Sequence, residues 1–445
     1  MSKKKTPIVA IVGRANVGKS SLFNVLIRRK EAIVAREAGT TRDSVTAKLS
    51  IADKDFWLVD TAGLKRAEDD FEATIQEQIE EAVLAADLIM VVIEAQTGIT
   101  EEDRRVATQA LKSKKPVCLL VNKHDKFRRG QSADYQRLGI KDIFLTSATT
   151  KSGIFELEEY LYRSLPKSTI AYDPHQIRVA LLGRPNVGKS ALFNALIKKQ
   201  QAVVSARAGT TRDVNRHQVK FMQKNIELLD TAGIRRSGKI EKGIEQFSVL
   251  RSLAAIEEAD ICLLLTDINE VGVVLDQKIA GLIKEAGKGL VLVVSKWDLA
   301  EKDTHTHGQI SGQVRGIFDF VPWAGLIFTS SVTGQNVSKI FELVLEIDQH
   351  RKQRLKTSQL NQWLTRVKLK HPPAGLKNTH PKLNYVTQLE GLPPAFKFFG
   401  KDMKFLHWSY KRYLEKSMRE EFGFDGTSVK LLFVEKTSEN PYINK

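Results

Sequence analysis

Cysteine is scarce in this chain, and long apolar runs are absent. Cys118 and Cys262 each lie within a short apolar run and share no metal-ligand spacing, which predicts buried thiols in a reducing compartment. The longest apolar runs, such as 261–265 and 290–294, are strand-sized, far below the ~18 residues that a membrane-spanning helix needs. The basic residues 1–5 lead into no sustained apolar stretch, so we expect no secretory signal here. We therefore expect a soluble, cytoplasmic protein.

Apolar residues make up 42% of the 445 residues, enough to fill real cores, and at ~150 residues per domain the length predicts about three domains. The formal net charge is +17, and it is concentrated near the end: residues 351–445 hold 19 Lys and Arg against 8 Asp and Glu. A focused positive field favours a polyanionic partner such as nucleic acid or an anionic membrane. The alternative is a surface that merely keeps the protein in solution.

Several short motifs occur twice in the same order. GRANVGKS at 13–20, AGTTRD at 38–43 and DTAG at 60–63 recur 170 residues later as GRPNVGKS, AGTTRD and DTAG. NKHD at 122–125 corresponds to SKWD at 295–298. A period this long is a whole domain, so the chain is predicted to be a tandem duplication. We expect a first domain at 1–165, a linker at 166–176, a second domain at 177–350 and a basic domain at 351–445.

Within each copy, short β-rich runs alternate with helical patterns, which predicts an α/β fold with a parallel sheet flanked by helices. In the basic domain, strands are expected at 384–389 and 429–434 and a basic helix at 409–422. In the repeats, strands are expected at 8–12, 56–59, 88–93, 117–121, 179–182, 226–229, 261–265 and 290–294, and helices at 73–85, 245–257 and 339–347.

The GxxxxGKS pattern between a strand and a helix is a phosphate-binding loop, in which glycines let backbone N–H groups turn toward phosphates at a helix N-terminus. Lys19 and Lys189 are predicted to reach the β- and γ-phosphates, and Ser20 and Ser190 to bind magnesium. Two copies in the same context make coincidence negligible. The two loops comprise Gly13, Arg14, Ala15, Asn16, Val17, Gly18, Lys19 and Ser20, and Gly183, Arg184, Pro185, Asn186, Val187, Gly188, Lys189 and Ser190.

The DTAG tetrads follow predicted strands. Asp60 and Asp230 would orient a magnesium-bound water, and the amides of Gly63 and Gly233 could sense the γ-phosphate. A lone tetrad is more often an ordinary turn, but its fixed spacing from both phosphate loops favours the functional interpretation. Of the upstream threonine pairs, we take Thr41 and Thr211 as magnesium ligands, although the sequence does not decide between neighbours. The remaining tetrad positions, with the residue after each, are Thr61, Ala62 and Leu64, and Thr231, Ala232 and Ile234.

A carboxylate can accept hydrogen bonds from both N1–H and the exocyclic amine of guanine, so Asp125 and Asp298 predict GTP rather than ATP. The stems of Lys123 and Lys296 can cover the base. Ser295 stands where the first copy has Asn122, and a hydroxyl makes fewer hydrogen bonds than an amide, so we expect the second site to hold guanine less rigidly. The base pockets are completed by His124, Ser147 and Ala148, and by Trp297, Ser330 and Ser331.

Five motifs in order, twice over, followed by a basic domain, resemble the Der (EngA) family of bacterial GTPases. The stretches YKRYLE at 410–415 and FGFDGT at 422–427 resemble that family's last domain, and the resemblance covers essentially the whole chain. It implies two GTPase domains and a small α+β KH-like domain, with GTP hydrolysed to GDP and phosphate. It also implies assembly of the large (50S) ribosomal subunit as the role and ribosomal RNA as the partner. We further expect a monomer with no membrane partner.

Leu64 and Ile234 stand where many related GTPases have a glutamine that orients the attacking water. The resemblance suggests that a potassium ion supplies charge near the phosphates, with Asn16 and Asn186 among its ligands; alternatively these asparagines only brace the loop. Phosphoryl transfer needs mainly positioning and charge neutralisation, and no general base is evident. We expect switch regions at 64–70 and 234–242, whose order depends on the γ-phosphate.

The basic domain holds 13 of the chain's 33 aromatic residues, most of which we assign to its core. The GFDG stretch at 423–426 formally matches the GxxG of KH domains, but we expect it to cap a helix. Two other functions agree less well with the sequence. The lack of a lipidation motif disfavours a membrane-associated GTPase, and two guanine motifs disfavour a P-loop enzyme that phosphorylates a small substrate. If this domain contacts RNA, the better candidates are Lys368, Lys370, Lys411, Arg412 and Lys416.

Overall fold

The structure is a computed structural model, and it divides the chain into two compact units. The first comprises Met1–Asp173 with Gln246–Glu258, and the second Pro174–Glu245 with Ala259–Lys445. The residues that the structure describes are 2–30, 46–52, 54–61, 79–80, 82, 84–126, 135–166, 169–171, 175–198, 215–230, 249–300, 305–376 and 379–435.

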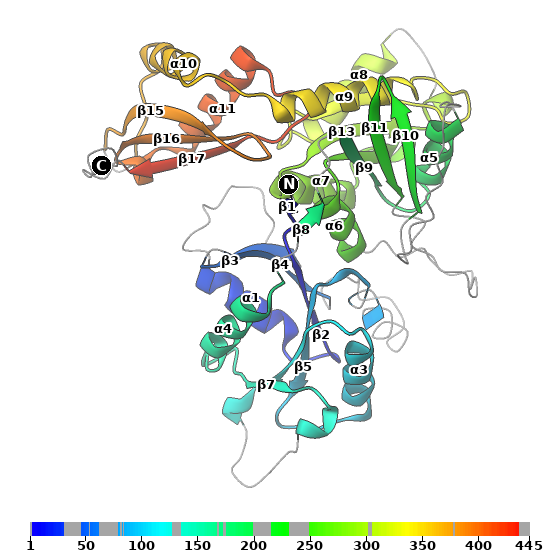
Figure 1. Cartoon of the computed structure of the whole chain (residues 1–445), viewed down its shortest axis with the longest axis vertical. Helices are drawn as coiled ribbons and strands as arrows, with labels where there is room; N and C mark the ends of the chain where they lie inside the picture. The colour runs from blue at the N-terminus through cyan, green and yellow to red at the C-terminus, as the bar shows by residue number, and fades with distance from the viewer. Residues whose placement is uncertain are drawn as a thin grey trace. The chain divides into compact units, whose positions relative to one another are not determined.

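The first unit is built on a six-stranded sheet with the strand order β3-β4-β2-β5-β6-β7. The strands β4, β2, β5, β6 and β7 pair in parallel, which agrees with the predicted parallel sheet. The outer strand β7 and the antiparallel edge strand β3 are not among the strands that the sequence predicts. Helices α1 and α4 lie on one side of the sheet and α3 on the other (Figure 1). The strands are β2 (Ile8–Val12), β3 (Thr46–Ile51), β4 (Lys54–Asp60), β5 (Leu88–Glu94), β6 (Val117–Asn122) and β7 (Asp142–Leu145). The helices are α1 (Lys19–Lys30), α3 (Glu101–Lys112) and α4 (Ile154–Ser164), with short 3-10 turns η2 (His124–Lys126) and η3 (Tyr135–Leu138).

The central strands read as continuous apolar runs because helices cover both faces of the sheet. Every residue of β2 is buried, and alternate residues Val9 and Ile11 pack in one cluster with Leu22 of α1 and Leu157 of α4. This core holds fixed the carboxyl ends of the strands, which is where ligands bind in open α/β sheets.

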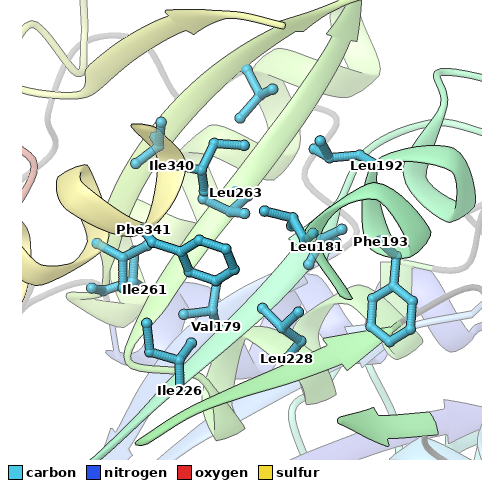
Figure 2. Close-up of a cluster of buried hydrophobic side chains, with 14 of the residues drawn as sticks. Val179, Leu181, Leu192, Phe193, Ile226, Leu228, Ile261, Leu263, Ile340 and Phe341 are labelled. Atoms are coloured by element: carbon cyan, nitrogen blue, oxygen red, sulfur yellow. The ribbon is translucent and has the colours of Figure 1, made fainter. Parts of the chain in front are cut away.

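The second copy repeats this architecture in the second unit, with the order β10-β11-β9-β12-β13-β14 and β10 as the antiparallel edge. Figure 2 shows its core, in which Val179 and Leu263 from the sheet pack against Phe341. The duplication is therefore structural as well as sequential. The strands are β9 (Gln176–Leu182), β10 (Asn215–Phe221), β11 (Lys224–Asp230), β12 (Ile261–Asp267), β13 (Gly289–Ser295) and β14 (Gly325–Phe328). The helices are α5 (Lys189–Lys198), α7 (Val274–Ala286), α8 (Thr306–Ile317) and α9 (Lys339–Lys352), with turns η5 (Ile268–Glu270) and η6 (Trp297–Leu299).

The C-terminal domain has a three-stranded sheet, in which β15 is antiparallel and β17 parallel to the central β16. Helices α10 and α11 cover one face (Figure 1). Trp363, Phe396, Phe398 and Phe424 are fully buried between them, so much of the aromatic content is core, as expected. The elements are α10 (Thr357–Lys370), β15 (Lys382–Leu389), β16 (Ala395–Lys401), η7 (Met403–Phe405), α11 (Trp408–Phe422) and β17 (Lys430–Glu435).

Elements of secondary structure lie at two of the expected domain boundaries. The expected linker contains a strand, β8 (Thr169–Ala171), which pairs antiparallel with β1 (Ser2–Lys4) in the first unit. Helix α9 runs through the expected boundary at 350/351, because Ile347 and Arg351 on its inner face are buried.

Two expected helices can be compared with the structure. Of the helix expected at 73–85, the structure describes helical residues at 79–80, 82 and 84–85. Helix α6 (Val249–Glu258) lies where a helix is expected at 245–257. Within the described ranges, no helix is long and apolar enough to cross a membrane.

Candidate functional site

Both GxxxxGKS loops connect a strand to a helix, as predicted: 13–18 joins β2 to α1, and 183–188 joins β9 to α5. Their backbones match closely, with φ of 64° at Asn16 and 62° at Asn186. This left-handed conformation is uncommon for residues other than glycine, and asparagine tolerates it better than most. The backbone alone thus explains an asparagine at this position.

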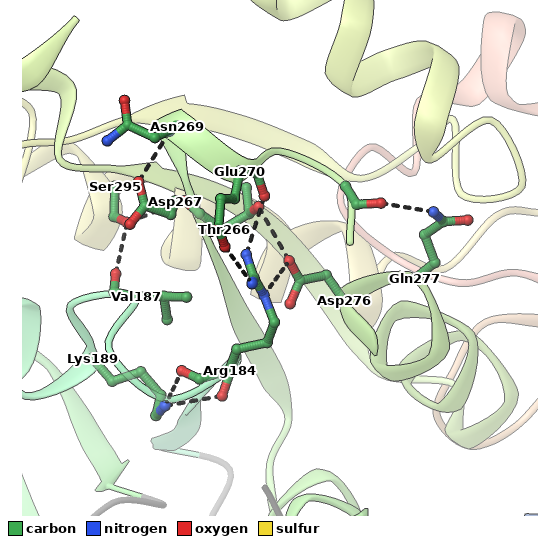
Figure 3. Close-up of polar contacts among 12 residues, drawn as sticks. Arg184, Val187, Lys189, Thr266, Asp267, Asn269, Glu270, Asp276, Gln277 and Ser295 are labelled. Carbon is green, nitrogen blue, oxygen red and sulfur yellow. Dashed lines mark hydrogen bonds and ion pairs between the residues drawn. The ribbon is translucent and has the colours of Figure 1, made fainter. Parts of the chain in front are cut away.

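The lysine of each loop is aimed into the loop. Lys19 Nζ donates hydrogen bonds to the carbonyls of Gly13 (2.7 Å) and Arg14 (2.6 Å), and Lys189 Nζ does the same with Gly183 (2.9 Å) and Arg184 (2.5 Å) (Figure 3). Lys19 is buried, and this burial lowers its pKa to about 8, although the charge of Asp60 opposes the shift. A phosphate at this position would stabilise the ammonium and compete with the carbonyls for it.

Oxygen atoms converge at the start of α1. The Ser20 hydroxyl donates to Asp60 Oδ2 at 2.5 Å, and the Asp60 side chain is buried. Hydroxyl and carboxylate oxygens are ligands that magnesium prefers, so this pair fits that ion. The hydroxyl of neighbouring Thr61 donates instead to the carbonyl of Ile11 (2.8 Å) and secures the strand end. Asp230 ends β11 in the corresponding register, but its side chain lies outside the described residues.

Part of the predicted site lies outside the described residues. It comprises Thr41, Ala62, Gly63, Leu64, Thr211, Thr231, Ala232, Gly233 and Ile234, together with the expected switch regions at 64–70 and 234–242.

The base-recognition motif of the first copy follows β6 and contacts the phosphate loop. Asn122 Nδ2 donates to the carbonyl of Val17 (2.8 Å), and Asn122 Oδ1 accepts from the amide of Ala148 (3.3 Å). Lys123 Nζ donates to the carbonyl of Asn16 (2.9 Å). Asp125 lies exposed on η2. One side chain, Asn122, therefore joins the phosphate loop to the loop at 147–148.

The corresponding motif of the second copy follows β13. Ser295 Oγ donates to the carbonyl of Val187 (2.7 Å) (Figure 3). Lys296 pairs with Asp267 (2.6 Å). Asp298 Oδ1 is buried and has no hydrogen-bond partner among the residues that the structure describes. Leaving a buried carboxylate oxygen unsatisfied is costly, and the N–H donors of guanine would satisfy it.

The loops that complete the two base pockets also correspond. The buried hydroxyls of Ser147 and Ser330 each accept the amide three residues further on, at 3.1 Å. Trp297 of the second motif is buried against Phe328, with ring centroids 4.7 Å apart. The structure thus brings together the phosphate-loop and base-recognition residues that it describes at the carboxyl end of each sheet.

Sequence reasoning missed a network around the arginine of each phosphate loop. Arg14 faces Glu94 (3.5 Å) and the fully buried Asp103 (3.6 Å). Arg184 pairs with Glu270 (2.7 Å) and the fully buried Asp276 (3.2 Å) (Figure 3). Burial raises the pKa of Asp276, and the Arg184 charge opposes that shift. A signal was available, since Asp103 and Asp276 are 173 residues apart, as are Asn122 and Ser295.

Comparisons with known proteins agree with this geometry. A family model described as a 50S ribosome-binding GTPase matches residues 8–123 and 178–296, and a model of the KH-domain-like C-terminal domain of EngA bacterial GTPase enzymes matches 354–433. GTPase Der of Chloroflexus aggregans is 42% identical over 437 residues, covering 96% of this chain and 97% of that protein. GTPase Der of Caldanaerobacter subterraneus is 40% identical over 425 residues, covering 95% of this chain and 97% of that protein.

Fold and site together define a P-loop GTPase with two G domains and a KH-like C-terminal domain. The chain binds guanine nucleotide and is an enzyme that hydrolyses GTP. From its similarity over nearly the full length of both relatives, it belongs to the Der family.

Proposed function

We propose that this GTPase is a nucleotide-controlled switch that binds ribosomal RNA and assists assembly of the large (50S) ribosomal subunit. The observation that carries the proposal is a basic, aromatic surface on the KH-like domain of a chain with two GTP sites. The family model described as a 50S ribosome-binding GTPase supports the same direction. We also propose that the protein is a cytoplasmic monomer.

Within each site, we assign one role to each residue type. Lys19 and Lys189 bind the β- and γ-phosphates, and Asp125 and Asp298 bind the guanine edge. Magnesium, when bound, neutralises phosphate charge. The residues that would hold it directly or through an oriented water are Ser20, Thr41 and Asp60, and Ser190, Thr211 and Asp230. The amides of Gly63 and Gly233 respond to the γ-phosphate.

We also propose that potassium activates GTP hydrolysis at both sites, with Asn16 and Asn186 among its ligands. An amide oxygen suits a hard cation, whereas the left-handed backbone explains these asparagines without one. GTPase rates of the intact chain in potassium and in sodium at equal ionic strength separate the two explanations. We expect faster hydrolysis in potassium; equal rates would leave the asparagines with a backbone role only.

The RNA-binding surface is proposed at the start of α11. Trp408 is 59% exposed there, and the Arg412 guanidinium lies 4.9 Å from its ring centroid. Lys411 lies over Phe433 at 5.2 Å. Exposed aromatic rings flanked by cations stack unpaired bases while the cations bind phosphates. Of the other candidates, Lys416 faces Glu420 (3.8 Å), and Lys368 donates to the carbonyl of Leu383 (2.8 Å), which gives Lys368 a structural role as well.

The GFDG stretch does not belong to this surface. Gly423 ends α11 by donating its amide to the carbonyl of Arg419 (2.8 Å), which is the capping role expected from the sequence. The Gly426 amide donates to the carbonyl of Trp323 (2.7 Å), and its carbonyl accepts from Leu290 (2.8 Å), both in the second G domain. These backbone groups are therefore occupied within the second unit.

Co-sedimentation with 50S and 30S subunits in GTP, GDP and a non-hydrolysable GTP analogue tests the proposal. We expect nucleotide-dependent association with 50S that Trp408→Ala and Arg412→Ala weaken. Arg163→Ala, an exposed arginine on α4, is the control and should have no effect. Binding could instead be independent of nucleotide, fall as salt rises, and weaken equally when either Arg412 or Arg163 is replaced. That result would show electrostatic attraction alone. It would refute a switch.

A further inference from the structure

In the first copy, several contacts join the phosphate loop to the base-recognition motif. Asn122 reaches the carbonyl of Val17 (2.8 Å) and the amide of Ala148 (3.3 Å). Lys123 reaches the carbonyl of Asn16 (2.9 Å). The carboxylate of Glu94 lies between the two parts, 3.0 Å from Lys123 and 3.5 Å from Arg14. Hydrogen bonds and ion pairs thus connect the half of this site that faces phosphate to the half that faces guanine.

The second copy keeps only part of these connections. Ser295 donates to the carbonyl of Val187 (2.7 Å), but its other contact is the carbonyl of Thr266 (3.1 Å), on the neighbouring strand of its own sheet. Lys296 contacts Asp267 (2.6 Å), as Lys123 contacts Glu94, but among the described residues it contacts no carbonyl of the phosphate loop. Arg184 pairs with Glu270 and Asp276, and its charge also acts on Asp267.

The room beside the second glycine of each loop differs in the same way. Gly18 and Gly188 share a φ of 93°. An ideal Cβ on Gly18 would lie 2.3 Å from Asn122 Nδ2, so the amide fills the space against the loop. At Gly188 the nearest atom is the Cβ of Ser295, at 4.0 Å. The smaller serine therefore leaves open the space that asparagine occupies in the first copy.

We propose that the two sites release guanine nucleotide at different rates, because Asn122 is a positioning residue that couples the phosphate and base halves of the first site more tightly than Ser295 couples those of the second. Ser295 keeps the bond to the carbonyl of Val187 but makes no bond to the loop at 330–331 among the described residues. Guanine nucleotide accordingly leaves the second site faster, since fewer contacts join its two halves. This inference rests on the two nucleotide sites assigned under the proposed function.

The duplication supplies its own controls for a test by reciprocal exchange. Lys189→Ala leaves the first site to be observed, and Lys19→Ala leaves the second. Release of fluorescent GDP from each full-length chain is followed by stopped-flow with excess unlabelled GDP. We expect release from the second site to be about threefold to tenfold faster, the effect of one net hydrogen bond.

Ser295→Asn should slow release from the second site, and Asn122→Ser should speed release from the first by a similar factor of about threefold to tenfold. Neither exchange should affect the other site. Ser295→Ala, which removes the remaining bond to Val187, should speed release from the second site further. If the residue at 122 or 295 served only the stability of the fold, Asn122→Ser would lower the free energy of unfolding and Ser295→Asn would leave the release rate unchanged.

Equal release rates from the two sites, or an unchanged rate in a folded Ser295→Asn chain, would overturn the coupling while leaving the site assignment intact. Nucleotide stoichiometry tests the assignment separately. We expect two nucleotides per wild-type chain and one for each lysine variant. Any other stoichiometry would refute the two-site assignment and the inference with it.

Discussion

The affinity of the first site for GDP should fall as pH rises above 7, because of Lys19. In the free protein, burial lowers the pKa of Lys19 from 10.5 to about 8. At pH 8.5 about three-quarters of these side chains are neutral. Phosphate favours the ammonium, so binding takes up a proton. The apparent affinity should therefore drop about fourfold between pH 7 and pH 8.5.

The stability of the nucleotide-free protein should change in the opposite direction. The folded-state pKa of Lys19 lies below its unfolded value, so between pH 8 and 10.5 the unfolded chain holds a proton that the folded chain has released. This group's contribution to the free energy of unfolding therefore rises with pH across that window. The buried charge that we assign to the phosphate site therefore destabilises the empty fold at neutral pH.

Calorimetric titration of the Lys189→Ala chain in two buffers of different ionisation enthalpy measures both affinity and proton uptake. At pH 8.5 we expect uptake of most of one proton at the first site. Lys19→Arg, whose guanidinium keeps its proton, should lose this pH dependence even if it binds more weakly. An affinity that stays constant from pH 7 to 8.5, without proton uptake, would refute the assignment of a buried, titrating lysine to the phosphate site.

Three further changes test the fold and the second site. Thr100→Ala removes the cap of α3 that Thr100 forms with Asp103 and should lower the free energy of unfolding by about 1 kcal/mol in urea, whereas Thr108→Ala within the helix should cost less. Trp363→Ala empties the core of the KH-like domain and should cost about 3–5 kcal/mol; thermal unfolding at the wild-type temperature would contradict the packing described here. Asp298→Asn should weaken GDP binding at the second site by roughly 10- to 100-fold and leave the first site unchanged, as measured in the two single-site chains.

The sequence predicted the parts of the fold in which burial dictates composition. Strands such as β2 and β12 are buried on both faces, so they read as apolar runs. The edge strands β3 and β10 mix polar and apolar residues, and nothing in TAKLSI or NRHQVKF specifies an antiparallel partner. Helix α9 passed through an expected boundary because the charged Arg351 looks like a linker residue but is buried.

The candidate sites divide in the same manner. Residues that we assign to direct contact with the nucleotide, such as Lys19 and Asp298, belong to motifs of fixed spacing and are recognisable from the sequence. Residues that support them are not, because their partners are distant in the chain. Asp103 reads as a solvated helix start in EED, yet it is fully buried and faces Arg14. Likewise, the sequence predicted that Ser295 would make fewer hydrogen bonds than an asparagine. It did not predict that the second contact of Ser295 would be the carbonyl of Thr266.

The short pairing of β1 with β8 bears on how such a chain could arise. Residues Ser2–Lys4 and Thr169–Ala171 hold the beginning and the end of the first G domain side by side. A module whose ends meet can be joined head to tail with another copy without stretching either fold. Copying one gene segment in place would then give two working modules at once. Each copy would be free to accumulate its own substitutions, as the serine at position 295 illustrates.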